Sequence, residues 1–146
     1  MNEIKNIALV AHDNCKKDMI EWVEFNKLTL ANHNLVCTGT TGKLVQKVVG
    51  PDINLTLLRS GPLGGDQQLG SLITEGKIDI LIFFWDPMQP QPHDVDIKAL
   101  LRITVLYNIP VACNRSTADF LISSELFDNE YNPILEDYTD YIRRTV

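Results

Sequence analysis

The sequence contains few cysteines, and their arrangement argues against a disulfide scaffold. Cys15, Cys37 and Cys113 are odd in number and show no Cys-x-x-Cys spacing. This usage is typical of a reducing compartment and not of a small secreted protein held together by disulfides. We interpret Cys37 and Cys113 as small apolar residues at the ends of strands.

Long apolar runs and targeting signals are also missing. The longest apolar run, residues 78–85, is interrupted by Asp79 and is much too short to cross a bilayer. Residues 1–5, MNEIK, do not form a signal-peptide pattern. We therefore expect a cytoplasmic protein that has no membrane partner.

Basic residues are fewer than acidic ones. The chain has 13 Lys and Arg against 19 Asp and Glu, which gives a net charge of −6. This balance argues against a nucleic-acid partner, because phosphate backbones are bound by clustered Lys and Arg. A small phosphorylated ligand is still compatible, since it needs only a few local donors. With 146 residues, of which 45% are hydrophobic, we expect a single domain over residues 1–146.

Short apolar runs alternate with helical patterns along the chain. The pattern predicts strands at residues 7–11, 35–38, 55–58, 78–84 and 111–113. It predicts helices at residues 15–32, 42–49, 66–75, 97–107, 118–123 and, in the tail, 137–144. The alternation indicates the α/β class: a three-layer sandwich around a five-stranded, mainly parallel sheet, for which we expect a flavodoxin-like winding.

Polar segments follow the carboxyl ends of the predicted strands. His12 and Asp13 follow the first strand, residues 38–43 the second, residues 60–66 the third and residues 85–94 the fourth. Ligands of parallel α/β sheets bind outside the carboxyl ends of the strands. We therefore expect these segments to form one site.

Residues 60–68, SGPLGGDQQ, are the strongest candidate for an anion-binding turn. Three glycines and a proline before a helix leave backbone N–H groups free for an anion. Asp66 would repel that anion, so its place suggests a general base acting on a substrate C–H. Its ordinary pKa of about 3.9 would have to be raised by burial. The alternative is a close-packing turn in which Asp66 is a helix cap or a first-turn acid.

A second anion-binding turn is possible at residues 38–43. Thr38, Thr40 and Thr41 offer hydroxyl and backbone donors at a predicted helix start, although the spacing is not that of a P-loop. An ordinary turn with a threonine cap explains the segment equally well. Lys16 could pair with the same anion, although a solvated helix lysine is the more common case.

The loop before the fourth predicted helix carries a candidate proton donor. Three prolines stiffen residues 87–92, and His93 follows them, where it could polarise a carbonyl or move a proton. Asp94 or Asp96 could cap the next helix. A metal site built on His12, His93 and nearby acids is disfavoured, because the His-x3-His and Cys-x2-Cys spacings are missing. We expect no metal.

Together these segments resemble methylglyoxal synthase. The matching stretches are residues 8–16, 38–42, 60–68, 83–87, 92–96 and 109–112. The resemblance implies the methylglyoxal-synthase-like fold and a lyase that converts dihydroxyacetone phosphate (glycerone phosphate) to methylglyoxal and inorganic phosphate. The implied steps are proton abstraction, enediolate formation and phosphate elimination, with no metal or organic cofactor. A homohexamer, allosteric inhibition by phosphate and a role in a glycolytic bypass are also implied.

The resemblance further implies roles for individual residues. Asp66 would be the acid/base that removes a proton from the hydroxymethyl carbon, and His93 would contact the carbonyl and hydroxyl oxygens. His12 would lie close to the substrate. The residues implied to hold the phosphate are Lys16, Thr38, Thr40, Thr41, Ser60 and Gly61. The supporting acids are Asp13, Asp86 and Asp96.

Two other functions fit the same residues. The first is a phosphate-sensing module without catalysis, which would have no need of Asp66 and His93. The second is another phosphate-handling enzyme, either an isomerase or a metal-dependent phosphatase. The products formed from dihydroxyacetone phosphate, and the effect of a chelator, distinguish these alternatives.

Overall fold

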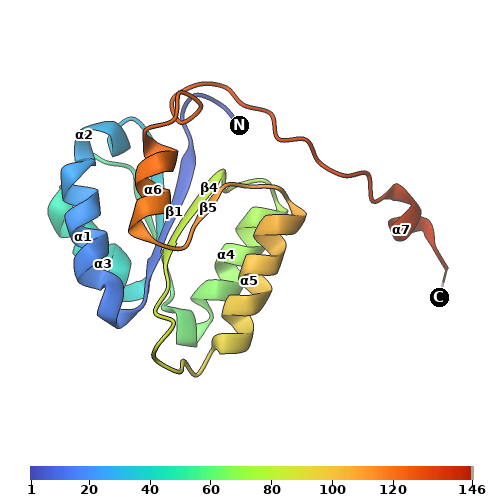
Figure 1. Cartoon of the computed structure of the whole chain (residues 1–146), viewed down its shortest axis with the longest axis horizontal. Helices are drawn as coiled ribbons and strands as arrows, with labels where there is room; N and C mark the ends of the chain where they lie inside the picture. Colours follow the sequence, from blue (N-terminus) through green and yellow to red (C-terminus); the bar gives the residue numbers. More distant parts are fainter. Residues whose placement is uncertain (146) are drawn as a thin grey trace.

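The computed structural model describes residues 1–145 and contains one five-stranded sheet with helices on both faces (Figure 1). The strands are β1 (Asn6–Ala11), β2 (Asn34–Thr38), β3 (Leu55–Leu58), β4 (Ile80–Phe84) and β5 (Val111–Ala112). Every pairing is parallel, and the order in the sheet is β3-β2-β1-β4-β5. The predicted three-layer α/β sandwich with a five-stranded parallel sheet is confirmed.

The winding differs from the flavodoxin-like prediction. A flavodoxin order is 2-1-3-4-5, whereas here β3 is an edge strand beyond β2 and β4 returns to the other side of β1. The hydrophobic pattern of a strand reports burial and not its neighbour, so it could not distinguish the two orders. The order reverses between β1 and β4, which places the topological switch point, and hence the expected crevice, beside the end of β1.

Helices of successive crossovers divide between the two faces of the sheet. On one face lie α1 (Lys16–Phe25), α2 (Lys27–Leu30), α3 (Gly39–Val49) and α6 (Arg115–Ile122). On the other lie α4 (Gly65–Thr74) and α5 (Asp94–Leu106) (Figure 1). Two short 3₁₀ turns, η1 (Asp13–Cys15) and η2 (Gly61–Leu63), precede α1 and α4. No helix among residues 1–145 is long and apolar enough to span a membrane.

The central strand β1 contributes side chains to both apolar cores. Ile7, Leu9 and Ala11 face the core beneath α1, α3 and α6, whereas Ala8 and Val10 face the core beneath α4 and α5. Alternation of apolar residues on both faces is what a strand enclosed by two helical layers requires. The packed sheet gives the loops at its carboxyl edge a rigid base.

Some helix boundaries differ from the predicted ones. The predicted helix at residues 15–32 is interrupted at Asn26, whose side-chain amide donates a 2.8 Å hydrogen bond to the Trp22 carbonyl and ends α1. Helices α3 and α5 each begin three residues earlier than predicted. As a result, Thr40 and Thr41 lie in the first turn of α3, where backbone N–H groups have no intrahelical acceptor.

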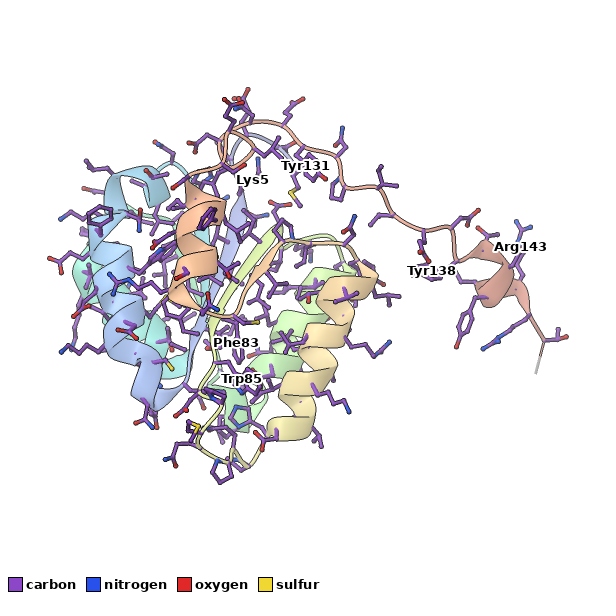
Figure 2. All side chains as sticks on the ribbon, viewed as in Figure 1. Lys5, Phe83, Trp85, Tyr131, Tyr138 and Arg143 are labelled. Carbon is purple, nitrogen blue, oxygen red and sulfur yellow. The ribbon has the colours of Figure 1, made fainter. Side chains whose placement is uncertain are left out.

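Phe127 is buried in the apolar core, and the chain beyond it runs into an extended segment with a short helix, α7 (Thr139–Arg143). Lys5 is almost fully buried and donates from Nζ to the Asn129 carbonyl, which anchors the base of this segment. Figure 2 shows Tyr138 and Arg143 out along the segment, away from Phe83 and Trp85 at the carboxyl end of β4.

Candidate active site

A cavity of about 240 Å³ lies at the carboxyl edge of the sheet. It is bordered by the ends of β1 and β2, the turn before α4 and the loop before α5. Of the twelve predicted site residues, Asp86 and Asp96 do not line it. The ten that do are His12, Asp13, Lys16, Thr38, Thr40, Thr41, Ser60, Gly61, Asp66 and His93.

Asp66 is a buried carboxylate without a hydrogen-bond donor. It lies in the first turn of α4, is 3% exposed, and neither carboxylate oxygen has a hydrogen-bond partner. Its Oδ2 lies 3.5 Å from Nε2 of His93. Burial raises the pKa of Asp66, an effect opposed by His93 and reinforced by the charge of Asp96. A buried carboxylate with two free oxygens is suited to accept a proton from a bound molecule.

His93 is held at the start of α5 with its ring towards Asp66. As the N-cap, it accepts hydrogen bonds at its carbonyl from the backbone N–H groups of Asp96 and Ile97, at 3.0 and 3.1 Å. Its ring is 8% exposed, and Nδ1 has no partner. The ring therefore offers polar atoms to the cavity at a fixed position.

His12 approaches the same space from the end of β1. Its Nδ1 accepts a 3.0 Å hydrogen bond from the Asp86 backbone N–H, and its buried Nε2 has no partner. The ring packs edge-on against Phe83 and His93, with centroids 5.2 and 5.8 Å away. Burial is the main cause that lowers the pKa of His12; His93 and Lys16 also lower it, against Asp86 and Asp94. His12 is therefore biased towards the neutral imidazole.

Two helix starts supply further hydrogen-bond donors to the cavity. Thr38 is the N-cap of α3 and Ser60 is the N-cap of η2, yet neither side chain caps its own helix. Both hydroxyls therefore stay available in the cavity, beside the unpaired N–H groups of the first turn of α3. Thr41 differs, because its hydroxyl donates to the Ala11 carbonyl at 3.2 Å and ties α3 to β1. This part of the cavity has the donors of an anion site.

Glycines allow the two turns to approach one another. Gly39 has a φ of +29°, and a Cβ there would lie 2.6 Å from Cα of Ser60. A Cβ on Gly61 would lie 2.6 Å from Nε2 of His93 and 3.3 Å from Oδ2 of Asp66. A side chain at Gly39 would therefore separate the start of α3 from Ser60, and one at Gly61 would separate this turn from His93 and Asp66.

Lys16 is the one lysine or arginine among the described residues that line the cavity. Its Nζ pairs with Oδ1 of Asp13, whose side chain is 95% exposed. The hydrogen bond from Lys16 is the main cause that lowers the pKa of Asp13. Because Asp13 is solvated and not buried, Lys16 can exchange this partner for an anion in the cavity at little cost.

Asp86 and Asp96 lie outside the cavity lining. Asp86 accepts 2.9 Å hydrogen bonds from the Asn14 amide and the Met88 backbone N–H, and the Met88 bond is the main cause that lowers its pKa. Asp96 affects the site through its charge on Asp66. Gln91, which the sequence analysis missed, does line the cavity. Its position between two prolines and just before His93 was the available signal.

No group of three or more His, Cys, Asp or Glu side chains within residues 1–145 is arranged to hold a metal ion.

Comparison with known proteins places the chain in a family. A family model described as an MGS-like domain matches residues 18–113. Methylglyoxal synthase of Maridesulfovibrio salexigens is 57% identical, with 99% of each chain covered. The enzyme of that name from Yersinia pestis is 58% identical over 96% of this chain and 90% of its own.

A solved structure agrees with the sequence matches. The crystal structure of methylglyoxal synthase from Elizabethkingia anophelis superposes with a TM-score of 0.93 at 50% identity, covering 100% of this chain and 95% of that one. Identity at this level over nearly the whole length, together with the match in fold, shows that the chain belongs to the methylglyoxal synthase family.

Proposed function

We propose that this protein is a lyase that converts dihydroxyacetone phosphate to methylglyoxal and inorganic phosphate. The observation that carries the proposal is the buried Asp66 carboxylate, which has no hydrogen-bond donor and lies 3.5 Å from Nε2 of His93. It lines the same cavity as the anion cradle, which consists of Thr38, Ser60 and the first turn of α3. A phosphate sensor would gain nothing from burying such a charge, whereas a general base requires it.

The reaction begins with proton transfer to Asp66. The carboxylate takes a proton from the hydroxymethyl carbon of the substrate, and the electron pair moves to the adjacent carbonyl oxygen to give an enediolate. His93 and His12 would donate hydrogen bonds to the substrate oxygens, His12 from its unpaired Nε2. A well-placed base contributes a factor of about 10² to 10⁴ in rate.

Elimination of phosphate follows. The hydroxyl proton on the former hydroxymethyl carbon passes to the other enediolate oxygen, so the deprotonated oxygen can form the aldehyde C=O. The C=C electrons shift to form a new C–C double bond to the phosphate-bearing carbon as the bridging C–O bond breaks, and inorganic phosphate leaves. The remaining enol takes up a proton at its terminal carbon and becomes methylglyoxal, so the overall reaction consumes no other reactant. The C–O bond breaks readily only when it stands out of the enediolate plane and overlaps the π system.

The anion cradle would hold the bridging C–O bond out of the enediolate plane. Thr38, Ser60 and the N–H groups at the start of α3 surround the phosphate position, and Lys16 supplies the positive charge. Gly61 would contribute its backbone, and Thr40 and Thr41 their N–H groups. Binding and elimination would thus depend on the same donors, which is how remote binding energy assists chemistry.

Several finer statements belong to the same proposal. Inorganic phosphate would bind the cradle as an inhibitor, because it carries the charge of the group the cradle holds. A homohexamer, a cytoplasmic location and a single domain over residues 1–146 stay predictions, as do the roles of Asp13, Asp86 and Asp96.

Product analysis tests the proposal directly. Purified protein is incubated with dihydroxyacetone phosphate, with and without a chelator, and dicarbonyl and phosphate are measured together. We expect the two in equal amounts and no effect of the chelator. Glyceraldehyde phosphate would indicate an isomerase, loss of activity with chelator a metal-dependent phosphatase, and phosphate binding without turnover a sensor. Each of these outcomes contradicts the proposal.

A further inference from the structure

We propose that Asn14 and Asp86 form a positioning pair that holds His12 in one tautomer, with the proton on Nε2 and its N–H aimed into the cavity. The expected effect of the pair on catalysis rests on the proposed function, whereas the assignment of the His12 tautomer does not depend on it. Neither Asn14 nor Asp86 lines the cavity, so the pair would act through His12 and not on the substrate.

The tautomer follows from the partner of Nδ1. A backbone N–H can only donate, and the Asp86 N–H lies 3.0 Å from Nδ1 of His12. Nδ1 must therefore present its lone pair, and a neutral imidazole with an unprotonated Nδ1 carries its hydrogen on Nε2. Nε2 is buried and has no protein partner, so its N–H is left for a ligand.

The carboxylate of Asp86 holds its own backbone in place. Oδ1 accepts from the Met88 N–H and Oδ2 from the side-chain amide of Asn14, each at 2.9 Å. The first bond fixes the turn that follows β4, and the second ties this turn to the segment that follows β1. Bonds to a carboxylate are among the stronger hydrogen bonds in proteins.

These hydrogen bonds link the segments that follow two neighbouring strands, β1 and β4. Ala11 and Phe84 are partners in the β1–β4 register, and the His12 N–H donates to the Phe84 carbonyl at 3.2 Å. Asn14, two residues beyond His12, then reaches Asp86, two residues beyond Phe84. Both ends of the His12 segment are thereby tied to the turn after β4, and the imidazole ring of His12 cannot rotate without breaking a hydrogen bond.

The fixed tautomer has a chemical consequence. An N–H at Nε2 stabilises negative charge that develops on a substrate oxygen, and it does so without first adding a positive charge to the site. The other tautomer would direct a lone pair at that oxygen and repel it. The pair would therefore affect the chemical step more than substrate binding.

The test combines imidazole nitrogen NMR with kinetics on Asn14→Ala. Asn14 is exposed, so the variant should fold. Asn26→Ala is the matched control, because Asn26 also makes a side-chain bond near α1 but lies away from the cavity. The protein has three histidines, and His12→Asn identifies the His12 signals by their loss. In the unaltered protein we expect Nε2 protonated and Nδ1 unprotonated.

In Asn14→Ala we expect an Nδ1-protonated form of His12 to appear and kcat to fall about 10-fold, with a smaller change in KM. Asn26→Ala should match the unaltered protein in both measurements. A protonated Nδ1 in the unaltered protein, or an unchanged tautomer in Asn14→Ala, would overturn the inference. A changed tautomer with unchanged kcat would overturn its catalytic part. If the unaltered protein itself did not turn over dihydroxyacetone phosphate while the tautomer still responded to Asn14→Ala, the proposed function would fail and the positioning pair would stand.

Discussion

The burial that suits Asp66 to act as a base also affects the stability of the folded protein. Its pKa is raised chiefly by burial, so the folded protein holds the Asp66 proton more tightly than the unfolded chain does. The stability contributed by this proton is therefore fully present below the ordinary pKa of aspartate, about 3.9, and is lost as pH rises through the raised folded value. At neutral pH the ionised carboxylate destabilises the fold.

Asp66→Asn should stabilise the protein at pH 7 while abolishing turnover. We expect a gain of about 1 kcal/mol in the free energy of unfolding at pH 7, because a buried unpaired charge is removed. The gain should shrink towards zero below pH 4. Urea unfolding at several pH values measures it, and Asp52→Asn, at an exposed position, is the control. A variant less stable than the unaltered protein at pH 7 would contradict the account.

Gly61 is required for the distance between the anion cradle and His93. A Cβ at Gly61 would lie 2.6 Å from Nε2 of His93, so Gly61→Ala should displace the imidazole and lower kcat about 100-fold. Gly70→Ala is a matched control inside α4, because its nearest neighbour would be Ile103 at an ordinary 3.7 Å. Steady-state kinetics on both variants check this. Equal kcat for the two would show that the close approach has no catalytic importance.

At the level of single residues, the sequence predicted which residues lie at the cavity better than it predicted their hydrogen-bond partners. Ten of the twelve predicted residues line one cavity, because strand ends of a parallel sheet meet at one edge. The partner of His12 was not predictable, since it is the backbone N–H of Asp86 on another strand end. Gln91 carries no motif of its own, so its place between two prolines and just before His93 was the one sequence signal for it.

The start of α3 links the sheet to the anion cradle. Thr41 is buried, and its hydroxyl bond to the Ala11 carbonyl fixes the first turn of this helix against β1. Thr41→Val keeps the shape of the side chain and removes the bond. We expect a loss of about 1 kcal/mol in the free energy of unfolding and weaker binding of inorganic phosphate.

Urea unfolding and titration calorimetry with phosphate measure the two effects of Thr41→Val. Thr56→Val, on an exposed position of β3, is the control and should change neither quantity appreciably. If Thr41→Val bound phosphate as tightly as the control, the position of α3 would not depend on this bond.

Element types were predictable, whereas helix starts were less so. Apolar periodicity located the strands and most helices, but α3 and α5 begin within the polar loops, before the first apolar residue of their patterns. Gly39, with a positive φ, opens α3, and such a residue gives no helical signal. The early start of α3 brings Thr40 and Thr41 to the cavity wall.

At the scale of the molecule, the C-terminal segment extends away from the sheet and the helices packed on it (Figures 1 and 2). Ile134 and Ile142 are 86% and 78% exposed, and Tyr141 is also exposed. Apolar side chains gathered on one segment in this way usually mark a protein–protein contact. The resemblance implies a homohexamer, and this segment is the part of the chain that we expect to cross to a neighbour.

Removal of residues 133–146 should therefore alter assembly more than folding. The bonds of Lys5 to Asn129 and of His33 to Asp128, which close the base of the segment, are retained. By analytical ultracentrifugation we expect the full chain near six times its mass of 16.5 kDa and the shortened chain at a smaller mass. The same mass for both would contradict the role of the segment.

The strand order was the part of the fold that the sequence could not supply. The apolar residues of β3 and β4 would be the same whichever neighbour each strand pairs with, so the flavodoxin-like and the observed orders predict the same pattern. The order is decided by how the crossover between β3 and β4 packs across the sheet. Either order collects the strand ends at one edge, which is why the site could be predicted although the winding was wrong.

The central claim is that Asp66 starts the conversion of dihydroxyacetone phosphate to methylglyoxal. The most direct measurement is the release of phosphate and dicarbonyl from this substrate by the unaltered protein and by Asp66→Asn at matched concentrations. We expect equal amounts of both products from the unaltered protein and at least a 10²-fold lower rate from the variant, which should still bind inorganic phosphate. Turnover by Asp66→Asn close to that of the unaltered protein would contradict the account.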